Sequence, residues 1–215
     1  MLGRNKERGE GFSEDLGSLR PGSLAVARVT LPYEAMAEPK RKLTYADLQI
    51  TPDDGRRFEL VRGALLVTPS PRPRHQRISL KLTLLLHGYF VTRGIGEVFA
   101  APTDVILTPE DVFVPDLLVV GNAGDVTERG IEAPPLLIVE ILSPSTRNQD
   151  RGVKAERYAE LGVLHYWMVD PERRIVDCFR LRGDAYERIA GADGGSTLTH
   201  PDWEGFAVDL ADLWP

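Results

Sequence analysis

Residues 135–142 read PLLIVEIL, a run of large aliphatic side chains with one carboxylate, Glu140, inside it. Short runs that are apolar at almost every position are typical of strands buried on both faces of a sheet. Burying an unpaired carboxylate is costly, so a buried Glu140 needs a cation, a hydrogen-bond network or a metal ion beside it. The alternative is a strand-end residue that reaches solvent, because Ser143-Pro144 follows closely.

A second carboxylate stands at the head of a second apolar run. Residues 115–120 read PDLLVV, and the proline before Asp116 keeps the chain extended at the entry to a strand. If the two runs are neighbouring strands, Asp116 and Glu140 repel each other unless one holds a proton or a cation neutralises both. A hard divalent ion meets this need, and Mg²⁺ favours one or two carboxylates with water and substrate phosphates.

Lys154 is the third candidate, on a helix expected after the Glu140 strand. It follows Asp150 by four residues, and Tyr158 continues the same helical stripe one turn on. The simplest interpretation is a surface ion pair between Asp150 and Lys154. The alternative is an ammonium group that completes a site with the two carboxylates.

This pattern resembles the PD-(D/E)XK signature of restriction-endonuclease-like nucleases, and more specifically the Uma-type restriction endonuclease family, which is found mainly in bacteria. The matching residues span roughly 43–186 and comprise residues 58–63, His75, Pro115-Asp116, residues 139–146, Asp150, Lys154, Tyr158 and residues 162–171. Ser143-Pro144-Ser145-Thr146 followed by Asp150 and Lys154 is the specific part. The general signature places a lysine two positions after the acidic residue, where this chain has Leu142. The Uma-type pattern moves the lysine to the next helix, where Lys154 stands.

The resemblance implies an α/β fold with a restriction-endonuclease-like core, in which helices flank a central mixed β-sheet. It also implies a metal-dependent endonuclease that hydrolyses phosphodiester bonds in DNA. Asp116 and Glu140 would bind Mg²⁺ or Mn²⁺ together with the backbone carbonyl of Ile141. The metal would activate water, and Lys154 would orient that water or balance charge in the transition state.

Further residues are candidates for supporting roles beside Tyr158. Glu59 is either a metal contact or a hairpin residue facing solvent. His75 faces inward at the start of a helix, either at the site or as a hydrogen-bonded core histidine. Asp150 is expected to steady Lys154. Asp104 alternates with aliphatic residues on its strand and is the weakest candidate.

The rest of the chain gives a coarser pattern. We expect a helix from Thr44 to about residue 48, a hairpin turning at Arg62-Gly63, a helix over 75–91, one strand over 98–107, a helix over 147–161 with a Thr146–Gln149 capping box and a Gly162 C-cap, a strand over 164–169 and a hairpin over 174–189. Residues 203–214 receive no assignment. Residues 1–40 lack periodicity and are expected to be a mobile N-terminal extension, which leaves residues 41–215 as the nuclease-like domain.

Composition limits the alternatives. Cys178 is the single cysteine, which excludes an intramolecular disulfide and a cysteine-cluster zinc site. The four histidines show no metal-ligand spacing. The sequence has no apolar run long enough to span a membrane and no signal-peptide pattern, so a cytoplasmic protein is expected.

The net charge of −6 leaves the substrate class open. A basic groove near Arg72, Arg74, Arg77 and Lys81 would favour nucleic acid. The alternatives are a catalytically inactive nuclease-like module that binds nucleic acid or protein, and a metallohydrolase that acts on other substrates. A homodimer is expected, because a small nuclease subunit needs a second copy to address both DNA strands.

Overall fold

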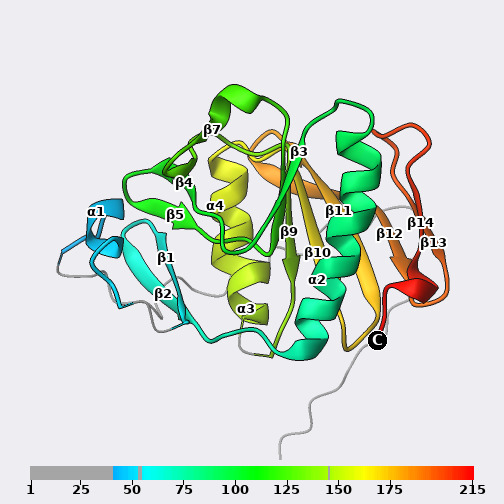
Figure 1. Cartoon of the computed structure of the whole chain (residues 1–215), viewed down its shortest axis with the longest axis horizontal. Helices are drawn as coiled ribbons and strands as arrows, with labels where there is room; N and C mark the ends of the chain where they lie inside the picture. Colours follow the sequence, from blue (N-terminus) through cyan, green and yellow to red (C-terminus); the bar gives the residue numbers. More distant parts are fainter. Residues whose placement is uncertain (1–40, 53–54, 145) are drawn as a thin grey trace, which may run out of the picture.

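The computed structural model describes residues 41–52, 55–144 and 146–215, so the extension expected over residues 1–40 lies outside the described residues. Helices pack around β-sheets, which confirms the predicted α/β class (Figure 1). The helical segments are α1 (Tyr45–Leu48), α2 (Pro73–Leu86), η2 (His87–Val91), η3 (Ala123–Asp125), α3 (Arg147–Gln149), η4 (Asp150–Lys154), α4 (Ala155–Glu160) and η5 (Leu210–Asp212). The strands are β1 (Arg57–Val61), β2 (Ala64–Thr68), β3 (Glu97–Ala100), β4 (Val105–Thr108), β5 (Asp111–Phe113), β6 (Leu117–Val120), β7 (Val126–Thr127), β8 (Gly130–Ile131), β9 (Leu137–Ile141), β10 (His165–Asp170), β11 (Ile175–Arg182), β12 (Ala185–Asp193), β13 (Thr197–Thr199) and β14 (Ala207–Asp209).

The central sheet has the strand order β12-β11-β10-β9-β6-β3. β9 and β10 run parallel and the other neighbours run antiparallel, so the sheet is mixed, as predicted. The two apolar runs are β6 and β9, which pair directly with Leu117 opposite Val139. Every position of both strands is buried. The structure confirms the two predicted buried strands and shows that they are neighbours, as a shared carboxylate site requires.

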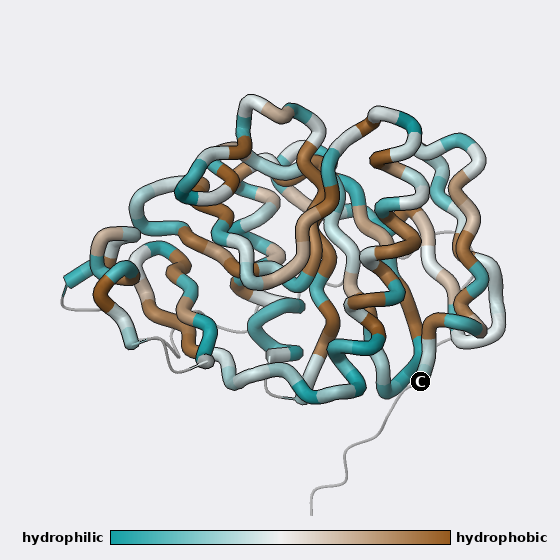
Figure 2. The backbone as a smooth tube through the Cα atoms, in the orientation of Figure 1, coloured by the Kyte–Doolittle hydropathy of each residue, from teal (hydrophilic) through white to brown (hydrophobic). Residues whose placement is uncertain are grey.

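Alternate side chains of β9 point into two different cores. Leu137 and Val139 pack on one face of the sheet with α2 and the C-terminal segment. Ile138 packs on the other face with Tyr158 of α4. Figure 2 shows the hydrophobic colour concentrated along these middle strands and recurring at intervals along α2. Because side chains alternate along a strand, Glu140 emerges on the α4 face, beside Ile138.

A second sheet, the side sheet, has the order β2-β1-β5-β4-β8-β7. The sequence predicted one strand over residues 98–107, and that prediction is wrong. β3 belongs to the central sheet and β4 to the side sheet, and the chain passes between them at Ala101-Pro102. Proline has no N–H to donate to a strand ladder, which is why the pairing ends there.

The β1–β2 hairpin turns at Arg62 and Gly63, as predicted. Both residues have positive φ angles, 53° and 80°, the combination that a two-residue type I′ turn requires. A Cβ atom on Gly63 would lie 2.6 Å from Cβ of Lys42, so a residue with a side chain would not fit at this position. This tight hairpin fixes the register that places Glu59 on β1.

The helix predicted over residues 147–161 is divided into α3, η4 and α4. Gly152 interrupts it with φ −108° and ψ −105°, angles that glycine adopts easily. The predicted capping box is wrong, because the Thr146 hydroxyl contacts Ser143 instead of capping the helix. Gly162 ends the segment with φ 84°, as predicted. The other long helix, predicted over residues 75–91, consists of α2 and η2 and begins at Pro73.

Residues 203–214, which the sequence left unassigned, complete the core on the α2 face. They supply the buried side chains Trp203, Phe206, Val208, Leu210, Leu213 and Trp214. No helix in the described part of the chain has the length and apolar character needed to cross a membrane.

Candidate active site

A pocket of about 400 Å³ lies where β1, the start of α2, the end of β9 and η4 meet. Most of the side chains predicted for the site line it, namely Glu59, His75, Asp116, Glu140, Ile141, Asp150 and Lys154. Tyr158 lies behind this lining and Asp104 lies elsewhere. The structure thus brings together residues from β1, α2, the position before β6, β9 and η4.

Glu140 is almost completely buried, with 4% of its surface exposed. Its Oε1 atom receives the Lys154 ammonium at 2.6 Å and the Tyr158 hydroxyl at 2.9 Å. No described residue hydrogen-bonds to Oε2. Burial raises the pKa of the Glu140 carboxyl to about 8, against the opposing charge of Lys154. Glu140 is therefore buried rather than solvent-exposed at a strand end.

Asp116 lies immediately before β6 and uses both carboxylate oxygens. Arg57 donates to Oδ1 at 2.6 Å, while Nε2 of His75 and the backbone N–H of Ile141 each lie 2.9 Å from Oδ2. Burial acts to raise the pKa of Asp116, but the bonds and charges of His75 and Arg57 outweigh it and lower the pKa. The bond from Ile141 ties Asp116 to the backbone of β9, next to Glu140.

Lys154 is buried and touches three carboxylates. Its ammonium lies 2.6 Å from Glu140, 3.0 Å from Glu59 and 3.5 Å from Asp150. Burial disfavours the charge, but Glu140 and Glu59 raise the pKa of Lys154 well above its ordinary value. A surface Asp150–Lys154 pair is the wrong interpretation, because both residues are only 3% exposed. The structure supports the alternative, in which the ammonium joins the carboxylate site.

The supporting candidates differ in their positions. Glu59 is buried, and its Oε1 also accepts the backbone N–H of Val114 at 2.9 Å, so it does not face solvent. Burial raises the pKa of Asp150. Asp104 precedes β4 in the side sheet, where its backbone carbonyl accepts the N–H of Ile131 at 2.8 Å. The expected approach of Asp104 to the site is not seen.

Arg57 is the residue that the sequence reasoning missed. It stands two positions before Glu59 on β1, and this spacing places both side chains on one face of the strand. The basic groove was predicted in part. Arg72 and Arg74 line the pocket, but Arg77 and Lys81 do not, and Lys81 donates to the carbonyl of Asp212 instead.

The sequence of this chain matches a known protein family. The sequence profile of the Uma2 family, described as a putative restriction endonuclease, matches residues 44–211, most of the chain. The chain belongs to the Uma2 family. Membership supports a nuclease function, which means the hydrolysis of phosphodiester bonds, and it confirms the resemblance seen in the sequence.

A solved structure shares the Uma2-family fold seen here. It is the crystal structure of a putative nuclease belonging to DUF820 from Anabaena variabilis ATCC 29413, with a TM-score of 0.65 and 18% sequence identity. The match covers 80% of this chain and 97% of that one. At this identity the likeness shows a common fold. A search of the curated proteins finds no match.

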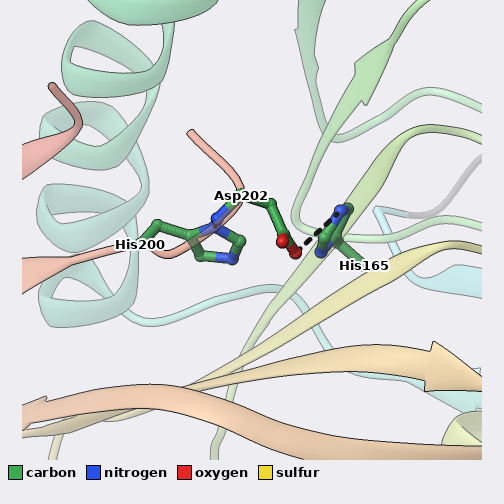
Figure 3. A group of neighbouring side chains, drawn as sticks. All are labelled: His165, His200 and Asp202. Atoms are coloured by element: carbon green, nitrogen blue, oxygen red, sulfur yellow. Dashed lines mark hydrogen bonds and ion pairs between the residues drawn. The ribbon is translucent and has the colours of Figure 1, made fainter. Parts of the chain in front are cut away.

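This member of the Uma2 family also contains a second group of titratable side chains, away from the pocket. His165, His200 and Asp202 converge, although the spacing of the histidines in the sequence predicted no such grouping (Figure 3). Burial lowers the pKa of both imidazoles to about 4, so both are neutral at pH 7.

Proposed function

We propose that the protein is a Mg²⁺- or Mn²⁺-dependent endonuclease that hydrolyses phosphodiester bonds in DNA. Asp116 and Glu140 hold the metal ion in this proposal, and Lys154 assists the reaction. The observation that carries the proposal is a charge imbalance among buried groups of the pocket.

The imbalance follows from a simple count. The buried carboxylates are Glu59, Asp116, Glu140 and Asp150, and the cations that bind them are Arg57 and Lys154. Four negative charges against two positive ones leave an excess of two when all are ionised, before any charge on His75 is counted. Burial, together with the charges of Asp150, Asp116 and Glu59, raises the pKa of Glu140 to about 8 against the lowering effect of Lys154. One divalent cation would neutralise the excess.

The donor atoms suit a hard cation. Asp116 and Glu140 offer carboxylate oxygens on neighbouring strands, and the Ile141 carbonyl is the third ligand in the proposal. Oxygen donors with room for water are what Mg²⁺ and Mn²⁺ prefer. When bound, such an ion lowers the pKa of a coordinated water and polarises the scissile phosphate.

The chain's own residues position the reacting groups. Tyr158 and Lys154 hold Glu140, and His75 and Arg57 hold Asp116, so both carboxylates are fixed before substrate arrives. In hydrolysis, the water oxygen loses a proton and bonds to phosphorus, the ester P–O bond breaks, and the departing oxygen takes up a proton. The Lys154 ammonium is the donor placed to orient the water or to stabilise charge on the phosphate oxygens.

The basic side of the pocket supports a phosphodiester substrate. Arg72 is exposed at the rim, and Arg74 lies beside it with a bond to the carbonyl of Pro171. Guanidinium groups match phosphate geometry and contact the backbone of nucleic acids without reading sequence. This arrangement favours nucleic acid over other metallohydrolase substrates.

Plasmid cleavage combined with metal-binding calorimetry tests the proposal. We expect Mg²⁺ or Mn²⁺ to bind and supercoiled DNA to be cut, with EDTA abolishing cleavage. Asp116→Asn and Glu140→Gln should lose both metal binding and cleavage. Lys154→Gln should lower the cleavage rate by about 10²–10³-fold, as loss of a transition-state donor does. Asp177→Asn, a carboxylate substitution in an ion pair on β11, is the matched control and should leave both unchanged.

The contrary outcomes are distinct. Metal binding without cleavage would keep the carboxylate site but refute DNA as the substrate. Absence of both would leave a nuclease-like binding module. We also infer a homodimer, because each chain contributes one such cluster within its described residues and a duplex presents two strands. Light scattering should give twice the chain mass, and a monomer at all working concentrations would refute the dimer.

A further inference from the structure

We propose that His165, His200 and Asp202 form a second metal site, which binds a transition metal such as Zn²⁺ and fastens the C-terminal segment to the central sheet. This site goes beyond the nuclease function, and none of its three residues lines the pocket.

The three side chains converge from two parts of the fold. His165 is the first residue of β10, while His200 and Asp202 lie in the connection between β13 and β14. One ligand atom from each lies within 4.8 Å of the other two, and Nε2 of His165 is 3.9 Å from Oδ2 of Asp202. Figure 3 shows the Asp202 carboxylate between the two imidazoles. Arg180 binds Oδ1 of Asp202 and so leaves Oδ2 directed to the imidazole side.

The two imidazoles are buried and poorly satisfied. His165 is 3% exposed and His200 is 5% exposed. Within the described residues, Nδ1 of His165 and Nε2 of His200 are buried and have no hydrogen-bond partner. From the described part of the chain the two imidazoles together accept one bond, a long one of 3.3 Å from the Asp202 N–H to Nδ1 of His200. Buried polar atoms are nearly always paired, so this group needs an explanation that packing does not supply.

The donor set indicates the class of metal. Two imidazoles and one carboxylate suit Zn²⁺ and its neighbours among the divalent transition metals, whereas Mg²⁺ and Ca²⁺ prefer sites built from oxygen alone. Metal on Nε2 of His200 would shift the imidazole proton to Nδ1 and cost the long bond from Asp202. That loss is small beside a metal–ligand bond.

The position of the group indicates a structural role. His165 and Trp167 lie on the α2 face of the central sheet, opposite the face that carries Glu140. The His200 ring stacks on Trp203 with centroids 3.7 Å apart and an interplanar angle of 13°. Trp203 and Phe206 in turn fill the α2-side core. A metal here would fix the connection that delivers these two aromatic side chains.

The test uses the full chain with Asp116→Asn and Glu140→Gln, a background that removes the ligands proposed for the pocket. After EDTA treatment and removal of the chelator, we would titrate Zn²⁺ and follow the melting temperature, then titrate Co²⁺ and follow visible absorption and tryptophan fluorescence. One equivalent of Zn²⁺ should raise the melting temperature. One equivalent of Co²⁺ should give d–d bands and quench Trp203, which stacks on a proposed ligand.

Single substitutions in the same background locate the site. His165→Gln, His200→Gln and Asp202→Asn should each weaken Zn²⁺ affinity by at least about tenfold, the minimum expected even for losing a residue that supports a ligand. Asp177→Asn should leave it unchanged. Absence of Zn²⁺ stabilisation and of Co²⁺ quenching in the background protein would overturn the proposal, even if a substituted protein fails to fold. Unchanged affinity in both histidine variants would overturn it equally.

Neither result depends on the nuclease proposal. Failure of Mg²⁺-dependent cleavage in the wild-type chain would leave the Zn²⁺ titration of this background interpretable. Failure of the Zn²⁺ titration would likewise leave the pocket and its cleavage assay untouched.

Discussion

Two carboxylates that are almost inaccessible to solvent, Asp111 in the side sheet and Glu140 in the central sheet, have pKa values shifted in opposite directions. Asp111 is 1% exposed and accepts two bonds from Arg157 at 2.7 and 2.8 Å, one from the Thr108 hydroxyl at 2.6 Å and one from the Arg62 N–H at 2.9 Å. Burial opposes its charge, but these bonds outweigh burial and lower the pKa of Asp111. Burial instead raises the pKa of Glu140.

The difference shows that burial alone does not mark a functional carboxylate. Arg157 binds both Asp111 and Glu160, and Arg62 supplies Glu160 with a second cation. Two cations therefore face two carboxylates, and Asp111 has donors for both oxygens, so its charge is compensated. Glu140 shares the Lys154 ammonium with Glu59 and Asp150. A shortage of positive charge is therefore the feature that separates a candidate site from a structural ion pair.

The largest expected effect is on the stability of an Asp111→Ala variant. The substitution leaves two guanidinium N–H groups of Arg157 and two further donors without their acceptor, while Arg157 keeps its bond to Glu160. We expect the free energy of unfolding to fall by about 3 kcal/mol, the low end for breaking a buried ion pair. Urea denaturation measures the loss. Asp177→Ala, which breaks an exposed pair, should cost no more than about 1 kcal/mol. If Asp111→Ala lost no more stability than Asp177→Ala, Asp111 would not be the structural ion-pair residue with which Glu140 is contrasted.

A smaller effect of opposite sign is expected for Glu140→Gln. Because the pKa of Glu140 rises from 4.5 to about 8 on folding, the metal-free chain must take up a proton at Glu140 when it folds at pH 7, and this opposes folding. Replacing it in EDTA-treated protein should raise the free energy of unfolding by about 1–3 kcal/mol. The same urea experiment compares it with wild type. If Glu140→Gln were as destabilising as Asp111→Ala, both carboxylates would be structural.

The pH dependence of stability sharpens the same contrast. Between pH 4.5 and about 8, folded metal-free protein keeps a proton on Glu140 that the unfolded chain has lost. The contribution is complete below the unfolded pKa and is lost as pH rises, with a slope of at most about 1.4 kcal/mol per pH unit. Thermal melts in EDTA should show wild type and Glu140→Gln converging towards pH 5. The lowered pKa of Asp111 acts oppositely, and its contribution is lost only in acid. If the curves of stability against pH were parallel for wild type and Glu140→Gln, they would contradict the raised pKa of Glu140.

The smallest effect concerns the rim of the pocket. Arg72→Gln should weaken DNA binding uniformly across sequences, because a phosphate contact carries no base information. The slope of log affinity against log salt should decrease by about 0.9, the contribution of one phosphate contact. Fluorescence anisotropy at several salt concentrations measures both. Arg182→Gln, an exposed substitution on β11, is the control. An unchanged slope for Arg72→Gln would place the DNA elsewhere.

Local patterns predicted much of the fold. Residues 135–142 and 115–120 were recognisable as buried strands because their neighbours are uniformly apolar, and Arg62-Gly63 predicted its turn from glycine's conformational freedom. The division of residues 98–107 between two sheets was not predictable in this way. Both halves are apolar, and nothing in their periodicity shows that β4 forms a hairpin with the adjacent β5 while β3 pairs with the more distant β6.

The site was predictable to the extent that its chemistry is local. Glu140 and Asp116 stood out against apolar strands, and the family resemblance supplied Lys154. Arg57 went unnoticed because its partner Asp116 is 59 residues away and an arginine at a strand's start is unremarkable. The meeting of His165 with His200 was hidden for a similar reason, since packing of the C-terminal aromatic residues brings them together.

The position of the Lys154 ammonium between Glu59 of the side sheet and Glu140 of the central sheet has a mechanical consequence. The two sheets are joined through the pocket itself, so the β1–β2 hairpin cannot separate from the central sheet without breaking these contacts. A ligand that tightens the pocket will therefore also slow the opening of that hairpin. The rate of hydrogen exchange at the amides of β1 and β2 should therefore report on ligand binding in the pocket.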